Sequence, residues 1–267
     1  MGEFAWLWRV GQFLLFVPVF LYVLVALLAY LYADKLIFQP PPASYRDNRQ
    51  LIKVPSDDQT AISAVYLPNP GARYTVLYSH GNAEDLGIVM PLLQRIHAGG
   101  FSVFAYDYQG YGTSQGTPSE ANAYRDAEAA YHYLTDALGV LPSHVLALGR
   151  SLGGGVAVEL ALRQPVGGLI IESSFVSTYR VMVRWPLFPF DKFRSLAKLP
   201  RVHCPVLVIH GTDDRLIPLW HGQALYQQAH EPKQSYWVAG AGHNDLAAVA
   251  GEHYLRALKD FVRRIDK

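Results

Sequence analysis

The sequence contains little cysteine, little charge and no clustered metal ligands, and each shortage excludes a class of protein. Its 267 residues include one cysteine, Cys204, so no disulfide can form within the chain. No group of cysteines and histidines has the spacing of a metal site, and we expect no metal or other cofactor. The 23 basic and 22 acidic side chains give a net charge of +1, which argues against nucleic acid as a partner. Charged residues make up only 17% of the chain, and one long apolar run accounts for part of this shortage.

That run, from Val10 to Tyr32, holds 23 residues without Asp, Glu, Lys or Arg. As a helix it would be about 34 Å long, enough to cross a hydrocarbon core of about 30 Å. Tryptophans flank one end and tyrosines the other, as interfacial aromatic residues do: Trp6, Trp8, Tyr30 and Tyr32. The run is longer than the apolar part of a signal peptide and does not end in a small-x-small cleavage site. We therefore predict a single-pass membrane anchor over residues 1–33, with the span at about 10–32, in contact with the lipid bilayer.

The side of the membrane on which the rest of the chain lies stays open. Arg9 precedes the run, whereas four basic residues follow it: Lys35, Arg46, Arg49 and Lys53. The positive-inside rule does not choose clearly between these two arrangements. Residues 34–50 are expected to form a linker, because Gln39-Pro40-Pro41-Pro42 cannot be helical. This linker is short, so the remaining domain would lie close to the lipid surface.

From residue 51 onward, short apolar runs alternate with helical patterns. We expect strands near 51–54, 61–67, 74–79, 101–106, 144–148, 169–171, 206–209 and 235–238. We expect helices near 86–98, 117–138, 156–162, 219–229 and 245–264, the second opening on a capping box with Pro118 at its first position. This alternation is typical of the α/β class, a mostly parallel sheet with helices on both faces, here in one domain over 51–267. Ligands of such sheets bind beyond the carboxyl ends of the strands.

Gly149-Arg150-Ser151-Leu152-Gly153 joins a predicted strand to a predicted helix, which is the context of a nucleophile elbow. Such a turn is so tight that the positions two residues before and after the serine must carry almost no side chain. Glycine occupies both positions. The turn would present the Ser151 hydroxyl at the head of a helix, where the N–H of Leu152 can face an oxyanion. A glycine-rich turn with an incidental serine is the alternative interpretation.

Two further segments place polar side chains directly after predicted strands. Asp213 and Asp214 follow the strand near 206–209, and His243 follows the strand near 235–238. In this order, His243 would take the Ser151 proton during attack on an acyl carbon and return it to the leaving group. One of the two aspartates would hold the imidazole. The backbone N–H groups of Asn82 and Leu152 would then form the oxyanion hole.

Together these motifs resemble the α/β-hydrolase superfamily of serine hydrolases, and within it the Bem46-like group that includes the ABHD13 and ABHD17 hydrolases. The matching segments are residues 35–40, 79–83, 107–114, 149–154, 210–214 and 242–245. The resemblance implies an α/β-hydrolase fold and a catalytic triad of Ser151, Asp214 and His243. It favours Asp214 over Asp213, because the family's acid is the last residue of His-Gly-x-x-Asp. One departure is Gln109, where many relatives carry Arg in the loop beside the site.

Other polar residues near these segments have structural interpretations. We expect Asp107 to fix a loop, His80 to be a structural hydrogen-bonding group, and Asp245 to cap the last helix. Six more histidines belong to no motif and are expected on the surface or in the core: His97, His132, His203, His221, His230 and His253.

An insertion at about 175–200 separates the strand after the elbow helix from the strand that leads to Asp214. It contains the apolar run Trp185-Pro186-Leu187-Phe188-Pro189-Phe190, and in this fold such an insertion commonly caps the site. Trp185, Phe188 and Phe190 are therefore candidate substrate-binding residues, in a groove for an acyl chain or a contact with the membrane. A local core for the insertion itself is the alternative.

These features predict a membrane-anchored serine hydrolase that cleaves acyl esters or thioesters through an acyl-enzyme. The anchor and the apolar cap favour long-chain substrates in the membrane. The resemblance adds S-acylated proteins, which would make the chain a depalmitoylase-like thioesterase, and lysophospholipids or acylglycerols, which would make it a lipase. A generic carboxylesterase, a peptidase and a non-catalytic scaffold are the remaining alternatives, and the sequence does not decide the oligomeric state.

Overall fold

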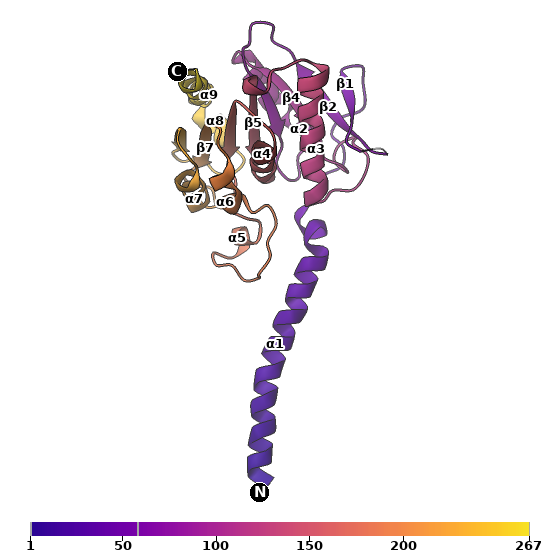
Figure 1. The fold of residues 1–267 in the computed structure, drawn as a ribbon, viewed down its shortest axis with the longest axis vertical. Coiled ribbons are helices and arrows are strands. Elements are labelled where there is room, and N and C mark those ends of the chain that lie inside the picture. The colour runs from indigo at the N-terminus through magenta and orange to yellow at the C-terminus, as the bar shows by residue number, and fades with distance from the viewer. Residues whose placement is uncertain (1, 58, 267) are drawn as a thin grey trace.

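A computed structural model describes residues 2–57 and 59–266 of the chain, with side chains from Gln12 onward. It consists of an α/β domain from which one long N-terminal helix extends (Figure 1). Trp6 and Trp8, two of the expected interfacial aromatic residues, lie outside the described side chains, and residue 58 lies outside the described residues.

Strands of the domain form one sheet in the order β1-β2-β4-β3-β5-β6-β7-β8. The bounds are β1 Leu51–Pro55, β2 Ala61–Leu67, β3 Thr75–Ser79, β4 Ser102–Tyr106, β5 Val145–Arg150, β6 Gly168–Glu172, β7 Val206–Gly211 and β8 Lys233–Val238. β1 and β2 are antiparallel to each other, β2 is antiparallel to β4, and all other pairs are parallel. The predicted fold class, a mostly parallel sheet in an α/β domain, is confirmed.

Helices cover both faces of this sheet and enclose two apolar cores. They are α2 Leu86–Ala98, α3 Glu120–His132, α4 Leu152–Arg163, α5 Tyr179–Met182, α6 Ser195–Lys198, α7 Trp220–Gln228, α8 Leu246–Ala250 and α9 Glu252–Ile265. Short 3-10 turns cover 142–144 and 199–201, and a π turn covers 133–137. One core holds side chains of α3, α4 and α7, and the other holds side chains of α2, α8 and α9. The central strands are buried on both faces, which explains their continuous apolar runs.

Some helix boundaries differ from those expected, and for two of them the local cause is visible. α3 begins after Ser119, whose Oγ accepts a hydrogen bond from Asn122 N at 3.1 Å, so Pro118 precedes the helix instead of occupying its first turn. The expected helix at 245–264 is two helices, because Gly251 adopts a φ of 53° that breaks it. Asp245 is the N-cap residue of α8 by position, but its carboxylate accepts from Gly242 N at 2.7 Å and not from the helix.

The N-terminal helix α1 runs from Gly2 to Ile37, five residues beyond the end of the expected span. Its part from Gln12 to Ile37 is long and apolar enough to cross a membrane. The last turn lies in the segment predicted as a linker and packs onto the domain, where Ala33 and Phe38 are buried. Asp34 forms an ion pair with Lys192 at 3.1 Å. The helix and the domain are therefore joined by packed side chains at residues 33–38.

The insertion between β6 and β7 holds α5 and α6, and we call residues 175–200 the cap. The cap lies on the side of the domain from which α1 emerges (Figure 1). Tyr22 Oη donates to the carbonyl of Leu187 at 2.9 Å, and Tyr179 Oη donates to the carbonyl of Ala29 at 3.0 Å. The cap therefore leans against α1 along about two turns of the helix.

Candidate active site

Ser151 occupies the predicted tight turn between β5 and α4, with φ 54° and ψ −118°. A Cβ at Gly149 would collide with the Gly153 carbonyl, and a Cβ at Gly153 would collide with the Ser79 carbonyl. A left-handed backbone at a non-glycine residue costs about 1–3 kcal/mol, so surrounding contacts must hold it. Ser151 N donates to the Glu172 carbonyl at 2.9 Å, and Ser174 Oγ donates to the Ser151 carbonyl at 2.7 Å. These bonds keep the strained turn in place.

Ser151, His243 and Asp214 meet at the carboxyl edge of the sheet. His243 Nε2 lies 3.1 Å from Ser151 Oγ, and His243 Nδ1 lies 2.8 Å from Asp214 Oδ2. The other carboxylate oxygen of Asp214 accepts from the N–H groups of Leu216 at 3.0 Å and Ile217 at 2.7 Å. The three side chains come from the loops after β5, β7 and β8, as predicted from their positions behind strands. A proton can pass between the serine and the imidazole in this arrangement.

The electrostatics of Asp214 suit an ionised carboxylate. Burial by itself raises the pKa of Asp214. The hydrogen bonds from His243 and from Ile217 N lower this pKa by more than burial raises it, so the net pKa lies below the ordinary value. His210 Nε2 lies 3.6 Å from the same carboxylate, and burial lowers the pKa of His210, which keeps it neutral. Asp214 therefore carries the negative charge that faces His243.

Both expected oxyanion donors follow strands at the carboxyl edge of the sheet, where Ser151 lies. Leu152 N begins α4, and Asn82 lies in the turn after β3. Within the described part of the chain, neither of these backbone N–H groups donates a hydrogen bond to another protein atom. Both are thus available to a ligand oxygen, as the first N–H groups of a helix usually are.

Arg150 makes a contribution that the sequence interpretation missed. Its side chain is buried, with 7% of the residue exposed, and it pairs with Glu84. Its Nη2 donates to the His243 carbonyl and to Asn244 Oδ1, both at 2.9 Å. Glu84 Oε2 accepts from Gly81 N at 2.7 Å. One buried ion pair therefore braces the serine turn, the histidine loop and the Asn82 loop, and the only sequence sign of it was a charge at the end of an apolar strand.

Asp107 and His80 have the structural roles expected of them. Asp107 Oδ1 accepts from Leu86 N at 2.8 Å, and its other oxygen accepts from Tyr45 Oη. His80 is buried, and its Nδ1 lies 2.7 Å from the Gly81 carbonyl. Both side chains hold the loop that leads from β3 to α2.

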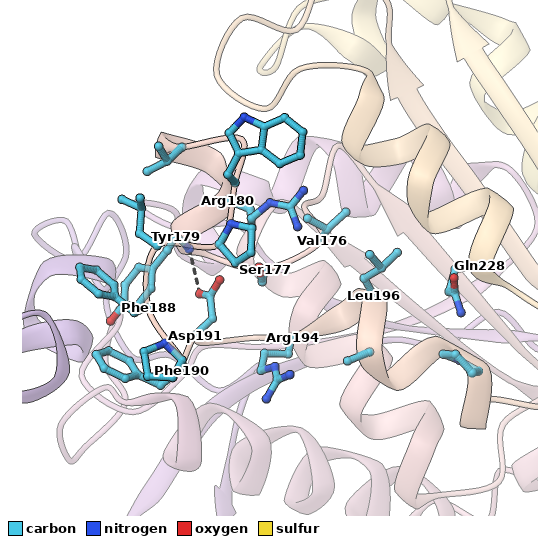
Figure 2. A pocket seen from close by; sticks show the side chains of 17 residues that line it. Val176, Ser177, Tyr179, Arg180, Phe188, Phe190, Asp191, Arg194, Leu196 and Gln228 are labelled. Atoms are coloured by element: carbon cyan, nitrogen blue, oxygen red, sulfur yellow. Dashed lines mark hydrogen bonds between the residues drawn. The ribbon is translucent and has the colours of Figure 1, made fainter. Parts of the chain in front are cut away.

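A cavity of about 350 Å³ lies in the cap and is lined by Trp185, Phe188 and Phe190 among others (Figure 2). Ser151, Asp214 and His243 do not line it. Phe188 and Phe190 stack on each other with ring centroids 5.3 Å apart, and they pack against Tyr22 and Tyr30 of α1. Trp185 is 73% exposed. The structure therefore brings the two phenylalanines to α1 and not to Ser151, His243 and Asp214.

Metal ligands show no comparable grouping. Among residues 2–57 and 59–266, no group of three or more His, Cys, Asp or Glu side chains is arranged to hold a metal ion. The single cysteine, Cys204, is free and mostly buried, and burial raises the pKa of its thiol to about 12. The polar chemistry at the carboxyl edge of the sheet therefore centres on Ser151 and its neighbours.

Sequence comparisons place the domain among hydrolases. Residues 70–197 match the family model described as serine aminopeptidase, S33. The chain is 43% identical over 200 residues to alpha/beta hydrolase domain-containing protein 17C of Xenopus tropicalis, covering 73% of this chain and 63% of that protein. It is 40% identical over 200 residues to the human protein 17B, covering 73% and 68%. The chain thus spans just under two thirds of the length of the 17C relative.

Solved structures with the same fold include two hydrolases. The esterase Pf2001 of Pyrococcus furiosus superposes with a TM-score of 0.72 at 19% identity, covering 85% of this chain and 97% of that one. A monoacylglycerol lipase of Paleococcus ferrophilus superposes with a TM-score of 0.61 at 20% identity, covering 76% and 99%. At these identities the likeness is one of fold.

Proposed function

Because the chain belongs to the α/β-hydrolase family that includes the alpha/beta hydrolase domain-containing proteins 17B and 17C, we propose that it is a membrane-anchored serine hydrolase of long-chain acyl esters or thioesters. The observation that carries this proposal is the pair of hydrogen bonds that links Ser151 through His243 to Asp214. A hydroxyl, an imidazole and a buried carboxylate in this order form the arrangement that activates serine for acyl transfer.

In the proposed reaction, Ser151 Oγ attacks the acyl carbon while His243 Nε2 takes its proton. The oxyanion of the tetrahedral intermediate receives hydrogen bonds from the N–H groups of Leu152 and Asn82. Collapse of the intermediate expels the alcohol or thiol, which takes the proton from His243 and leaves an acyl-enzyme. His243 then activates water, which releases the fatty acid and restores Ser151. Asp214 holds the Nδ1–H tautomer and stabilises the imidazolium.

The position of the cap on α1 supports a substrate within the membrane. Residues 10–33 contain no charge, and a hydrocarbon core of about 30 Å takes up about 20 of these residues. Any 20-residue stretch within 10–33 includes residues 14–29, and therefore both Tyr22 and Ala29, which bind the cap. If α1 spans a bilayer, the parts of the cap that bind Tyr22 and Ala29 lie within the hydrocarbon core.

The active edge of the sheet faces the same way. The cap follows β6, and Asn82, which follows β3, bonds to Ile37 at the end of α1. The cap and the Asn82 turn therefore both start from the carboxyl edge of the sheet, where Ser151 also lies. We therefore propose a substrate whose acyl carbonyl is held at the lipid surface. The first candidate is the thioester of an S-acylated protein. The ester of a lysophospholipid or monoacylglycerol is the competing form.

Labelling with a fluorophosphonate probe tests the serine mechanism in the full chain held in lipid nanodiscs. We expect wild type to be labelled, and Ser151→Ala and His243→Ala to lose labelling while their thermal transitions stay within a few degrees. A folded wild type that is not labelled, or a labelled Ser151→Ala, would falsify the proposal.

Hydrolysis of acyl esters and matched acyl thioesters of increasing chain length, with Ser151→Ala as blank, tests the substrate class. A maximum at long chains supports the membrane substrate, and the ester-to-thioester ratio ranks the two forms. A maximum at short chains reduces the proposal to a membrane-tethered esterase. Turnover of peptides without turnover of esters replaces it with a peptidase.

A further inference from the structure

The C-terminal end of α1 has all four of its terminal carbonyl groups paired, and one of the partners comes from the catalytic domain. A helix leaves these four groups without partners inside the helix. Three are paired by the chain that follows directly: Asp34 with Phe38 N, and Lys35 and Leu36 with Gln39 Nε2. The fourth, the carbonyl of Ile37, accepts from Asn82 Nδ2 at 2.6 Å. Asn82 therefore caps the anchor helix from 45 residues away.

The oxygen of the Asn82 side-chain amide also has hydrogen-bond partners. Asn82 Oδ1 accepts from Gln39 N at 2.9 Å, from Tyr111 Oη at 2.6 Å and from Ala83 N at 3.0 Å. Tyr111 Oη in turn accepts from Gln39 N at 3.1 Å, and the Tyr111 side chain is buried. We call the side chains of Asn82 and Tyr111, with the backbone of residues 37–39, the Asn82 clamp.

The clamp rests on packed side chains. Phe38 is buried between Tyr111, with ring centroids 6.4 Å apart, and Phe193 of the cap, with centroids 6.0 Å apart. A displacement of the end of α1 would therefore change the hydrogen bonds of Asn82 as well as this packing. The geometry of the Asn82 turn and that of the anchor are linked.

Asn82 is also the residue whose backbone N–H is a proposed oxyanion donor. Its turn is unusual, because the next residue, Ala83, has a φ of 56°. The bond from Ala83 N to Asn82 Oδ1 supports that turn from within, and the bonds to Ile37 and Gln39 hold it from outside. An oxyanion donor has to lie within about half an ångström of its productive position. The clamp therefore helps to set this position, together with the bond from Gly81 N to Glu84.

We propose that the Asn82 side chain is a positioning residue that aligns its own backbone N–H for the oxyanion by fastening it to the end of the membrane anchor. This inference rests on the proposed function. It means that hydrolysis depends on the docked state of α1, so the anchor is a structural part of the oxyanion hole. A clamp that merely attaches the helix would alter stability but leave the turnover of the folded protein unchanged.

The first test compares kcat and KM of full-length variants in nanodiscs, normalised to the folded fraction. Asn82→Ala keeps the backbone N–H but loses the clamp, and Tyr111→Phe loses one donor to Oδ1. We expect kcat to fall by roughly 10- to 100-fold in Asn82→Ala and by less in Tyr111→Phe, with KM changed by less than about twofold. Gln39→Ala is the matched control, because it removes two other caps of the same helix end and should keep kcat within about twofold.

The second test uses a long-chain trifluoromethyl ketone, which Ser151 attacks to form a hemiketal oxyanion, and a long-chain ether that lacks the carbonyl. We expect the ketone to bind Asn82→Ala more weakly by the same factor as kcat falls, and the ether to bind equally well to both proteins. Unchanged ketone affinity in folded Asn82→Ala, or an equal loss in Gln39→Ala, overturns the inference while the hydrolase remains. A wild type that does not react with the ketone overturns the proposed function, and this inference with it.

Discussion

Asp213 and Asp214 are adjacent in the chain, yet only Asp214 contacts His243. Its carboxylate lies 2.8 Å from His243 Nδ1, whereas Asp213 is exposed and accepts from Thr212 Oγ1 at 2.9 Å. The turn after β7 is fixed by the bonds from Leu216 N and Ile217 N to Asp214, which point its second oxygen at the imidazole. The choice between the two aspartates is therefore made by the backbone of this turn.

At this scale we predict a large difference between two amide substitutions. Asp214→Asn removes the acceptor that holds the Nδ1–H tautomer, so kcat should fall by roughly 10⁴-fold, whereas Asp213→Asn should stay within about twofold. Steady-state hydrolysis of a long-chain ester by both variants, each checked for folding by its thermal transition, measures the difference. A greater loss of kcat in Asp213→Asn would show that Asp213, and not Asp214, is the acid of the triad.

The buried side chain of Arg150 contacts the histidine loop and the Asn82 loop from its own position beside Ser151. Arg150 follows Gly149 in the strand and precedes Ser151, and its guanidinium reaches the His243 carbonyl and Glu84. A buried charge is costly unless it is paired and hydrogen-bonded, and here both conditions are met. The residue therefore links three loops that the sequence places far apart.

At the scale of elements, the junction of α7 with the cap contains a buried histidine. His221 Nδ1 accepts from Val176 N at 3.3 Å, and its ring stacks on Trp220 with centroids 3.7 Å apart. Burial lowers the pKa of His221 to about 3, so the imidazole is neutral in the folded chain. An unfolded histidine takes up a proton below about pH 6.5. The free energy of unfolding is therefore expected to fall as the pH drops below about 6.5, because His221 binds a proton in the unfolded state but not in the folded state.

We predict that His221→Gln flattens this dependence, since glutamine keeps an acceptor for Val176 N but does not titrate. Between pH 6.5 and pH 5.0, wild type should lose about 2 kcal/mol more of its unfolding free energy than the variant. Urea titrations of both proteins across this range measure the difference. Parallel stability profiles would show that His221 is protonated in the folded chain.

Across the whole molecule, α1, the cap and the carboxyl edge of the sheet lie on one side. The cap leans on α1 through Tyr22, Ala29 and Tyr30, and it exposes Met182 at 86% and Leu187 at 51% on its surface. Exposed apolar side chains beside a candidate membrane span are typical of a surface that contacts lipid. This arrangement would place the catalytic edge at the membrane surface.

At this scale we predict that Met182→Glu and Leu187→Glu each lower the ratio of long-chain to short-chain ester hydrolysis by roughly tenfold. A charge placed in hydrocarbon costs about 2.5–3.5 kcal/mol, which would lift the cap away from the lipid. The measurement uses vesicle-embedded long-chain esters and a soluble short-chain ester.

Leu141→Glu is the matched control for this pair. Leu141 is 58% exposed and precedes β5, at the opposite edge of the sheet from Ser151. Its substitution should leave the ratio unchanged. An equal fall in all three variants would mean that added charge acts on something other than contact between the cap and lipid.

Local patterns alone were enough to predict the α/β class, the apolar span and the elbow at Ser151. Each depends on neighbours in the chain: continuous apolar runs, a stretch without charge, and glycines at the two positions where a side chain would collide with the backbone. The motifs added the family, which the relatives 17B and 17C confirm. The start of α3 after Ser119 and the break at Gly251 were not predicted, because Thr117 and Ser119 can both cap a helix and a glycine inside a helical pattern does not by itself end the helix.

Only the tertiary structure decided which side chains meet across loops. The brace of Arg150 with Glu84 joins segments 66 residues apart, and the contact of the cap with α1 joins segments 165 residues apart. The same is true of the capping of Ile37 by Asn82. Such contacts leave no period in the sequence, because they depend on how the turns after β3, β5, β7 and β8 orient their side chains in space. The sequence shows each of these residues, but their partners are decided by how the edge of the sheet, the cap and α1 pack together.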